Sequence, residues 1–194
     1  MDKARLEAFS DGVIAVIITI MVLELKVPHG DDLHALDGML PVFLGYVLSF
    51  IYVGIYWNNH HHLLHATRHI SGSVMWANLH LLFWLSLVPV LTGWVGANSS
   101  AAWPTALYGV VLLMAALAWL ILEKRIIAAN GKDSELALAV QHGVKENVSP
   151  VLYVSAIGLS FVRPWIADVL YAVVALMWFV PDRRIESKLT GEGS

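Results

Sequence analysis

The side chains best suited to metal chemistry in this 194-residue chain are His60, His61, His62, His65 and His80. His61 and His65 are four residues apart, a spacing that places two imidazoles on one face of a helix and suits zinc or iron. With Asp11 and His80 they would form an intramembrane metal-dependent enzyme. No HExxH or paired-carboxylate motif accompanies them. We therefore predict no metal site and no catalytic residues, and keep the metal-dependent enzyme as the weaker alternative.

Asp11 is the second candidate, because it lies just inside a long apolar run, RLEAFSDGVIAVIITIMVLEL, residues 5–25. A charge in hydrocarbon costs about 3 kcal/mol on insertion scales and usually has a partner. A proton-relay role would make the protein a proton-coupled secondary transporter, but the internal repeats and broken helices typical of transporters are not evident. We predict a structural role, with donors from the segments around Trp57, Trp76, Asn58, Asn78 and the histidines.

The composition is that of an integral membrane protein. The chain is 58% hydrophobic and only 14% charged, and its mean hydropathy is +0.67. A soluble domain would be about 25% charged. No basic patch with interleaved aromatic residues supports nucleic-acid binding, and the lack of cysteine excludes disulfides and thiol catalysis.

Six apolar segments are long enough to cross a bilayer, which needs about 20 residues. We predict an all-α protein with one six-helix transmembrane domain over 1–194 and an N-terminus that is retained. The longest connection, about 123–147, contains SELALAVQHGVKE, which we interpret as a short interfacial helix. The predicted spans are about 7–26, 40–60, 75–96, 102–122, 148–163 and 164–181.

The distribution of Lys and Arg predicts the orientation. Ten of the twelve lie on one side of the predicted spans, and only Lys26 and Arg163 lie on the other. The first connection on that other side is acidic, with Asp31, Asp32 and Asp37. We therefore expect a multi-pass protein of the inner (plasma) membrane with both termini in the cytoplasm.

A helical wheel of the first span places a set of mostly apolar residues on one narrow face. At 100° per residue, the members of this face lie within about 60° of Val16. Ser10 and Asp11 point well away from it. Because lipid is as apolar as isoleucine, the wheel alone does not distinguish a lipid-facing stripe from a functional one. The members of this face are Arg5, Phe9, Gly12, Val16, Thr19, Ile20, Leu23 and Val27.

The motif Arg5-x-x-x-Phe9-Ser10-Asp11, followed by an Ile/Val-rich stretch that ends TIMVLEL, resembles the lysosomal potassium channel family called transmembrane protein 175. The stretches WNNHH, residues 57–61, and NLHLLFWLSLVP, residues 78–89, are similar to the second and third spans of that family. The chain looks like a prokaryotic member with one six-span unit.

The resemblance implies a cation channel without a re-entrant pore loop, assembled as a homotetramer whose four first helices line the pore. We expect weak to moderate selectivity for K⁺ over other monovalent cations and no cofactor besides permeant K⁺. The partners are then a second copy of the chain, the permeant ions and the lipid bilayer. The filter motif TVGYG is absent, and LTGWVG at residues 91–96 is interpreted as the start of a loop.

The resemblance also assigns roles to residues. It implies a hydrophobic constriction that serves as gate and filter, with Arg5 and Phe9 at the cytoplasmic mouth. Val16 departs from the larger Ile or Leu that is more frequent in the family. Glu24 is either a solvated helix end or part of an acidic outer mouth. The implied constriction comprises Val16, Thr19, Ile20 and Leu23, and the implied hydrogen-bond network comprises Ser10, Asp11, Trp57, His61, Asn78 and His80.

Overall fold

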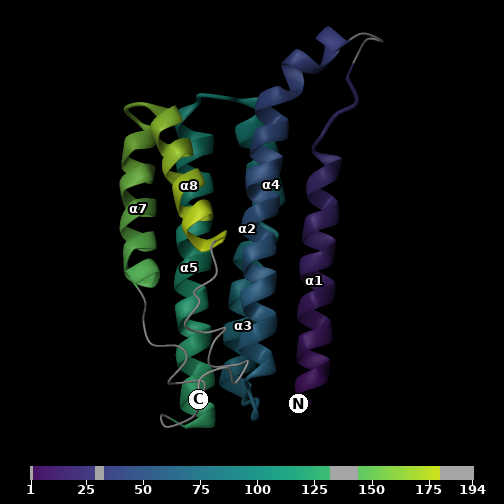
Figure 1. The fold of residues 1–194 in the computed structure, drawn as a ribbon, viewed down its shortest axis with the longest axis vertical. Helices are drawn as coiled ribbons and strands as arrows, with labels where there is room; N and C mark the ends of the chain where they lie inside the picture. The colour runs from purple at the N-terminus through teal and green to yellow at the C-terminus, as the bar shows by residue number, and fades with distance from the viewer. Residues whose placement is uncertain (1, 29–32, 132–143, 180–194) are drawn as a thin grey trace, which may run out of the picture.

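The computed structural model describes residues 2–28, 33–131 and 144–179, and all the regular secondary structure within them is helical (Figure 1). A short 3₁₀ helix, η1, precedes α2, and a single residue, Leu87, separates α3 from α4. The helices are α1 (Lys3–Leu23), η1 (Leu33–Met39), α2 (Leu40–His65), α3 (Gly72–Ser86), α4 (Val88–Ala97), α5 (Ala102–Asn130), α7 (Val144–Ser160) and α8 (Pro164–Phe179).

Among the described residues, four segments are apolar and long enough to cross a membrane: α1, α2 with the end of η1, α3 together with α4, and α5. Counting α3 and α4 as one interrupted helix, the protein is a multi-pass membrane protein with six main helices. The last two are shorter, at 17 residues for α7 and 16 for α8. At 1.5 Å per residue these extend about 25 Å, slightly less than a hydrocarbon core of about 30 Å.

Three boundaries differ from the sequence-based expectations. Helix α1 ends at Leu23 with Glu24 as its C-cap, so Val27 lies beyond the helix and does not extend the face of the wheel. The third span is interrupted because Pro89, in the first turn of α4, has no N–H for the carbonyl one turn earlier. Residues 134–143 of the expected interfacial helix lie outside the described residues, and Val144–Glu146 begin α7.

The interpretation of residues 91–96 as a loop start is wrong, because they belong to α4. Two glycines explain how this helix packs so closely. A Cβ at Gly93 would collide with the side chain of Glu24, and one at Gly96 would lie 3.0 Å from the backbone of Val42. The two glycines therefore let α4 approach α1 and α2 closely, and are not signs of a turn.

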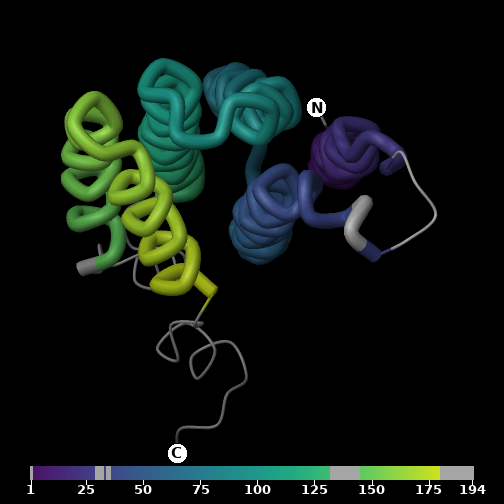
Figure 2. Tube along the Cα trace, turned by 90° about the horizontal axis from the view of Figure 1, so that it is seen from above, coloured from purple at the N-terminus to yellow at the C-terminus, as the bar shows by residue number. Residues whose placement is uncertain are grey.

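Helix α1 lies at one edge of the bundle and α7 and α8 lie at the opposite edge (Figure 2). Helix α1 contacts α2, α3 and α4, whereas α5 packs against α3, α4, α7 and α8. Polar groups in the middle of the bundle satisfy one another: Tyr52 donates to the Tyr171 carbonyl at 2.6 Å, and Tyr171 donates to the Thr105 carbonyl at 3.0 Å. Such pairing is required where no water is available.

The helix ends that carry basic residues meet at one end of the bundle. The Lys3 ammonium donates to the carbonyl of His65 at 2.6 Å, joining the start of α1 to the end of α2. At the end of α5, the Asn130 side chain accepts from the backbone N–H groups of Arg68 and His69 at 2.9 and 2.8 Å. The ends of α1, α2, α3 and α5 are thereby fixed together.

Candidate pore-lining face and the polar network behind it

One face of α1 is buried against the rest of the chain. Its members recur every three or four residues, the spacing of a single helix face. Four of them are apolar and one is a serine. The buried positions are Leu6, Ser10, Ile14, Ile17 and Met21. The buried hydroxyl of Ser10 needs hydrogen-bond partners, and a chain of hydrogen bonds supplies them.

That chain is fully buried and joins three helices. Ser10 donates to its own helix, to the Leu6 carbonyl at 2.8 Å, and its oxygen accepts from the Asn78 amide at 2.8 Å. The Asn78 amide oxygen lies 2.6 Å from Nε2 of His60, which therefore serves as the donor. Ser10, His60 and Asn78 each have no exposed surface. The chain fixes α1 to α2 and α3 at this level.

Asp11 lies beside this chain and has a different partner. The indole N–H of Trp57 donates to its carboxylate at 3.1 Å. The Trp57 ring stacks on His61, with ring centroids 6.4 Å apart, and Nδ1 of His61 lies 3.2 Å from the carboxylate of Glu7. Two carboxylates one turn apart on α1 are thus bound by two side chains one turn apart on α2.

The structure assembles most of the expected network and leaves out one member. Within the described residues, the hydrogen bond of His80 is with Trp84 of the same helix at 2.9 Å, so His80 is not linked to Asp11. His60 and Glu7 take part although the predicted network did not include them. The spacing in the sequence could have indicated both residues, because His60 lies three residues after Trp57 and Glu7 lies one helical turn before Asp11.

The opposite face of α1 is largely exposed among the described residues. Val16, Ile20 and Leu23 retain 55%, 44% and 77% of their surface. Phe9 is about half exposed, and Arg5, exposed at the start of the helix, forms no hydrogen bond or ion pair with another described residue. The stripe identified on the helical wheel is therefore a continuous uncovered face of large apolar side chains.

Thr19 is the polar member of this face. Its hydroxyl donates to the Val16 carbonyl of its own helix at 2.9 Å. The proton is therefore directed toward the backbone, and the oxygen lone pairs remain available on the exposed side. Such an oxygen can accept from water or contact a cation, whereas its apolar neighbours cannot.

The C-terminal end of α1 is positioned by α4. Glu24 caps the helix and packs against Gly93, where no side chain obstructs it. A carboxylate is thus placed directly after Leu23, the last residue of the exposed face. It is the negative charge nearest to this end of the stripe on α1 itself.

The histidine pair does not gather further ligands. The rings of His61 and His65 stack with centroids 6.2 Å apart. Within the described residues, no group of three His, Cys, Asp or Glu side chains is placed to hold a metal ion. Glu7 is the carboxylate that approaches His61, and the arrangement is a polar contact between α1 and α2.

Known proteins similar to this chain include potassium channels. Residues 5–89 match the family described as the endosomal/lysosomal potassium channel TMEM175. A potassium channel from Chryseobacterium sp. (strain P1-3) is 55% identical over 189 residues, which cover 97% of this chain and 98% of that protein. A potassium channel from Streptomyces collinus is 28% identical over 190 residues, covering 91% of both.

A solved structure agrees in fold. The crystal structure of a lysosomal potassium-selective channel TMEM175 homolog from Chamaesiphon minutus matches with a TM-score of 0.78 and 26% identity, covering 91% of this chain and 95% of that one. The family resemblance predicted from Arg5-x-x-x-Phe9-Ser10-Asp11 is confirmed by these matches. This chain belongs to the TMEM175 family, which is a family of ion channels and not of enzymes.

Proposed function

We propose that this protein is a potassium channel whose weakly to moderately K⁺-selective pore is lined by the exposed face of α1. The observation that carries the proposal is the uncovered stripe of Val16, Ile20 and Leu23 on a helix whose other face is fixed by buried hydrogen bonds. Because lipid can cover such a face equally well, the choice of neighbouring subunits around a pore rests on the channel family to which the chain belongs.

The apolar side chains would act as both gate and filter. A narrow ring of Ile and Leu holds no continuous water, and an ion does not cross without some hydration. A small rotation or tilt of α1 would widen the ring and let partly hydrated cations pass. Because such a throat offers no cage of carbonyl oxygens, we expect modest K⁺ selectivity, aided by K⁺ dehydrating more easily than Na⁺ and by the Thr19 hydroxyls.

The assembly we infer is a homotetramer with four copies of α1 around the axis. One chain presents one such face, and one helix cannot enclose a pore. Arg5 and Phe9 would border the cytoplasmic mouth. Native mass spectrometry of the purified channel should give four times the 21.4 kDa of the chain, and a stable monomer would contradict the assembly.

We infer that both termini lie in the cytoplasm of a cell whose plasma membrane holds the channel. The basic residues Lys3, Arg68 and Arg125 belong to segments whose ends meet at one end of the bundle, and basic residues favour the cytoplasmic side. The whole chain, 1–194, would act as one transmembrane domain, with α7 and α8 as its fifth and sixth spans.

The decisive measurement is current through purified protein in planar bilayers, with KCl on one side and NaCl on the other. We expect a reversal potential that shows cation permeation with a modest preference for K⁺. Absence of current, together with proton-coupled uptake into liposomes, would instead support a transporter and contradict the pore.

A further inference from the structure

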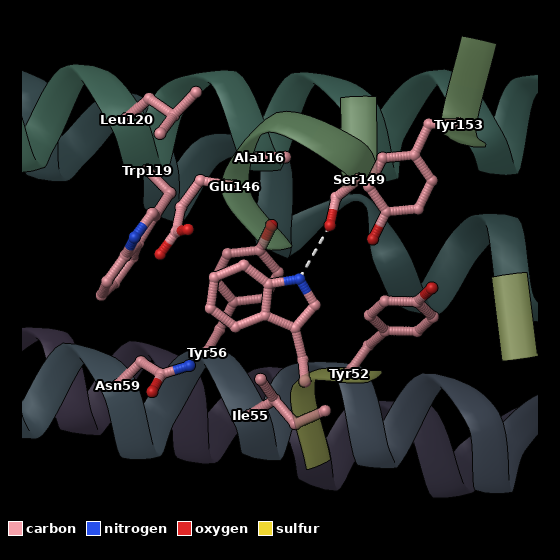
Figure 3. A pocket seen from close by; sticks show the side chains of 11 residues that line it. Tyr52, Ile55, Tyr56, Asn59, Ala116, Trp119, Leu120, Glu146, Ser149 and Tyr153 are labelled. Carbon is pink, nitrogen blue, oxygen red and sulfur yellow. Dashed lines mark hydrogen bonds between the residues drawn. The ribbon is translucent and has the colours of Figure 1, made fainter. Parts of the chain in front are cut away.

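A cavity separate from α1 opens between α2, α5, α7 and α8 (Figure 3). Tyr56 of α2, Trp119 of α5 and Trp178 of α8 contribute aromatic walls, while Ile55 and Leu120 contribute aliphatic ones. None of its lining residues belongs to the proposed pore face or to the network behind it. The cavity is therefore available for a role other than conduction.

The aromatic walls are held in fixed orientations. The rings of Tyr56 and Trp119 meet edge to face, with centroids 6.2 Å apart and planes at 65°. The indole of Trp178 donates to Ser149 at 2.9 Å, and Ser149 in turn donates to the Lys145 carbonyl at 2.7 Å. Rigid aromatic rings that face a common space can attract a cation through their negatively charged faces.

A carboxylate completes the cavity. Glu146, in the first turn of α7, lines it, and its Oε2 is buried without a hydrogen-bond partner among the described residues. Figure 3 shows this carboxylate directed toward the space between Trp119 and Tyr56. A buried acceptor without a partner is costly, and a cation or a donor that enters the cavity would supply the missing partner.

A second buried carboxylate, Glu123, lies near the cavity. Glu123 lies one turn after Trp119, is only 5% exposed, and also has a buried Oε2 without a partner among the described residues. It lies near enough to Glu146 for the two charges to interact. Glu123 does not line the cavity and interacts with Trp119 and Lys124 as well as with Glu146, so the Glu146 carboxylate is the one that faces the cavity.

The surroundings select an organic cation over a metal ion. Within the described residues the two carboxylates are not joined by a third His, Cys, Asp or Glu ligand. The remaining walls are mainly hydrocarbon and aromatic, which suits an ammonium group that carries methylenes. The cavity extends along α2 from Tyr52 to Asn59, and its Asn59 end lies two residues beyond the Trp57 that binds Asp11, toward the interface where Trp and Tyr are expected.

We propose that this cavity is a binding site for an alkylammonium group, held between the Glu146 carboxylate and the rings of Tyr56, Trp119 and Trp178. Two sources share this chemistry: the headgroup of phosphatidylethanolamine in the cytoplasmic leaflet, and a free amphiphilic amine. The site does not depend on conduction, so binding tests it independently of the pore.

The first test is calorimetric titration of the purified full-length channel in detergent with benzylammonium, and with benzyl alcohol as its neutral counterpart. We expect benzylammonium to bind at least tenfold more tightly than the alcohol. Glu146→Gln should weaken benzylammonium binding at least tenfold, and Trp119→Phe should weaken it about fivefold. Equal binding of the alcohol, or unchanged affinity in Glu146→Gln, would overturn the proposal.

Asp2→Asn is the matched control, because Asp2 is exposed at the N-cap of α1 and asparagine caps a helix equally well. Its affinity for benzylammonium should equal that of the unaltered channel. If Asp2→Asn weakens binding as much as Glu146→Gln does, binding depends on the net charge of the protein, and the proposal is overturned. Size exclusion checks the folding of each variant. If Glu146→Gln does not fold, Trp119→Phe decides: unchanged affinity there overturns the site.

The second test distinguishes the two sources. Delipidated channel is mixed with equal amounts of phosphatidylethanolamine and phosphatidylglycerol and examined by native mass spectrometry. Preferential retention of phosphatidylethanolamine that is lost in Glu146→Gln supports the lipid as the source. Benzylammonium binding without lipid preference supports a free amine, and failure of both probes overturns the site.

Discussion

The two faces of α1 are built from similar apolar residues and yet differ in what opposes them. Ile14, Ile17 and Met21 are buried where α1 packs against α2, α3 and α4, whereas Val16, Ile20 and Leu23 stay largely exposed among the described residues. The only fully buried polar residue of the helix, Ser10, lies on the first face. The anchoring face therefore holds the helix, and the exposed face is the one that we propose lines the pore.

Hydropathy alone does not distinguish these situations. The most apolar windows of α1 and α5 have mean hydropathies of 2.1 and 2.3, but 28% of the first is buried inside the chain against 56% of the second. Helix α5 is the centre of the bundle, and α1 is at its edge (Figure 2). The position of a membrane helix depends on its neighbours, which hydropathy does not record.

The largest effect that we expect comes from breaking the anchoring face with Asn78→Ala. This change removes the acceptor of His60 and the donor to Ser10, and a buried donor without a partner costs about 1–3 kcal/mol. Together with the lost bond to Ser10, we expect a loss of about 3 kcal/mol, measured as a lower thermal midpoint in detergent. Ser86→Ala, on the exposed side of the same helix, is the control and should change the midpoint little.

A double variant sharpens this test. If the penalty arises from stranded polar groups, replacing His60 together with Asn78 by leucine should be less destabilising than the sum of the two single changes. Additive losses would show that the bond between these two residues does not carry the stability, and would contradict the interpretation.

Asp11→Ala should have the second-largest effect, on assembly and not on ion preference. The lost bond to Trp57 involves a charged acceptor, and such bonds contribute about 1.5–3 kcal/mol. Trp57→Phe removes the same bond from the other side, so both variants should reduce the yield of assembled channel similarly. Normal assembly with an altered K⁺/Na⁺ permeability ratio would contradict a structural role for Asp11.

The sequence was sufficient for much of this organisation. The six apolar segments follow from composition, and the exposed stripe follows from the 100° period of a helix. The partner of Asp11 was among the candidates because an intramembrane carboxylate requires a donor, and Trp57 was one of the tryptophan, asparagine and histidine donors on the second and third spans. Each of these inferences depends on local chemistry and spacing, which the sequence records directly.

The remaining features depend on long-range packing. The participation of His60 follows from how α2 and α3 face each other across Asn78, and the exclusion of His80 follows from its bond to Trp84. Residues 91–96 are glycine-containing and suggested a turn, but close approach of α4 to Glu24 and Val42 explains those glycines. A motif gives the kinds of partners, and only the packing gives their identities.

The free face gives the third prediction. Ile20→Asn should wet the constriction and increase the current about tenfold, which corresponds to about 1.4 kcal/mol at the barrier. Val22→Asn is a close control, because Val22 is 46% exposed against 44% for Ile20 but points about 120° away from Val16. Single-channel and macroscopic currents of the two variants are compared at equal amounts of reconstituted protein. Equal currents in both would remove Ile20 from the pore.

Thr19→Val should produce the smallest effect, confined to selectivity. Valine keeps the shape of threonine and removes the one oxygen that the exposed face offers to a cation. Because that oxygen would contribute only part of a partly hydrated ion's coordination, we expect the K⁺/Na⁺ permeability ratio to fall about twofold, a change of about 0.4 kcal/mol, with little change in total current. Thr19→Ser, which keeps the hydroxyl, should retain the ratio. If the valine variant also retains it, the selectivity arises from the apolar ring alone, because no other polar side chain lies on this face between Phe9 and Leu23.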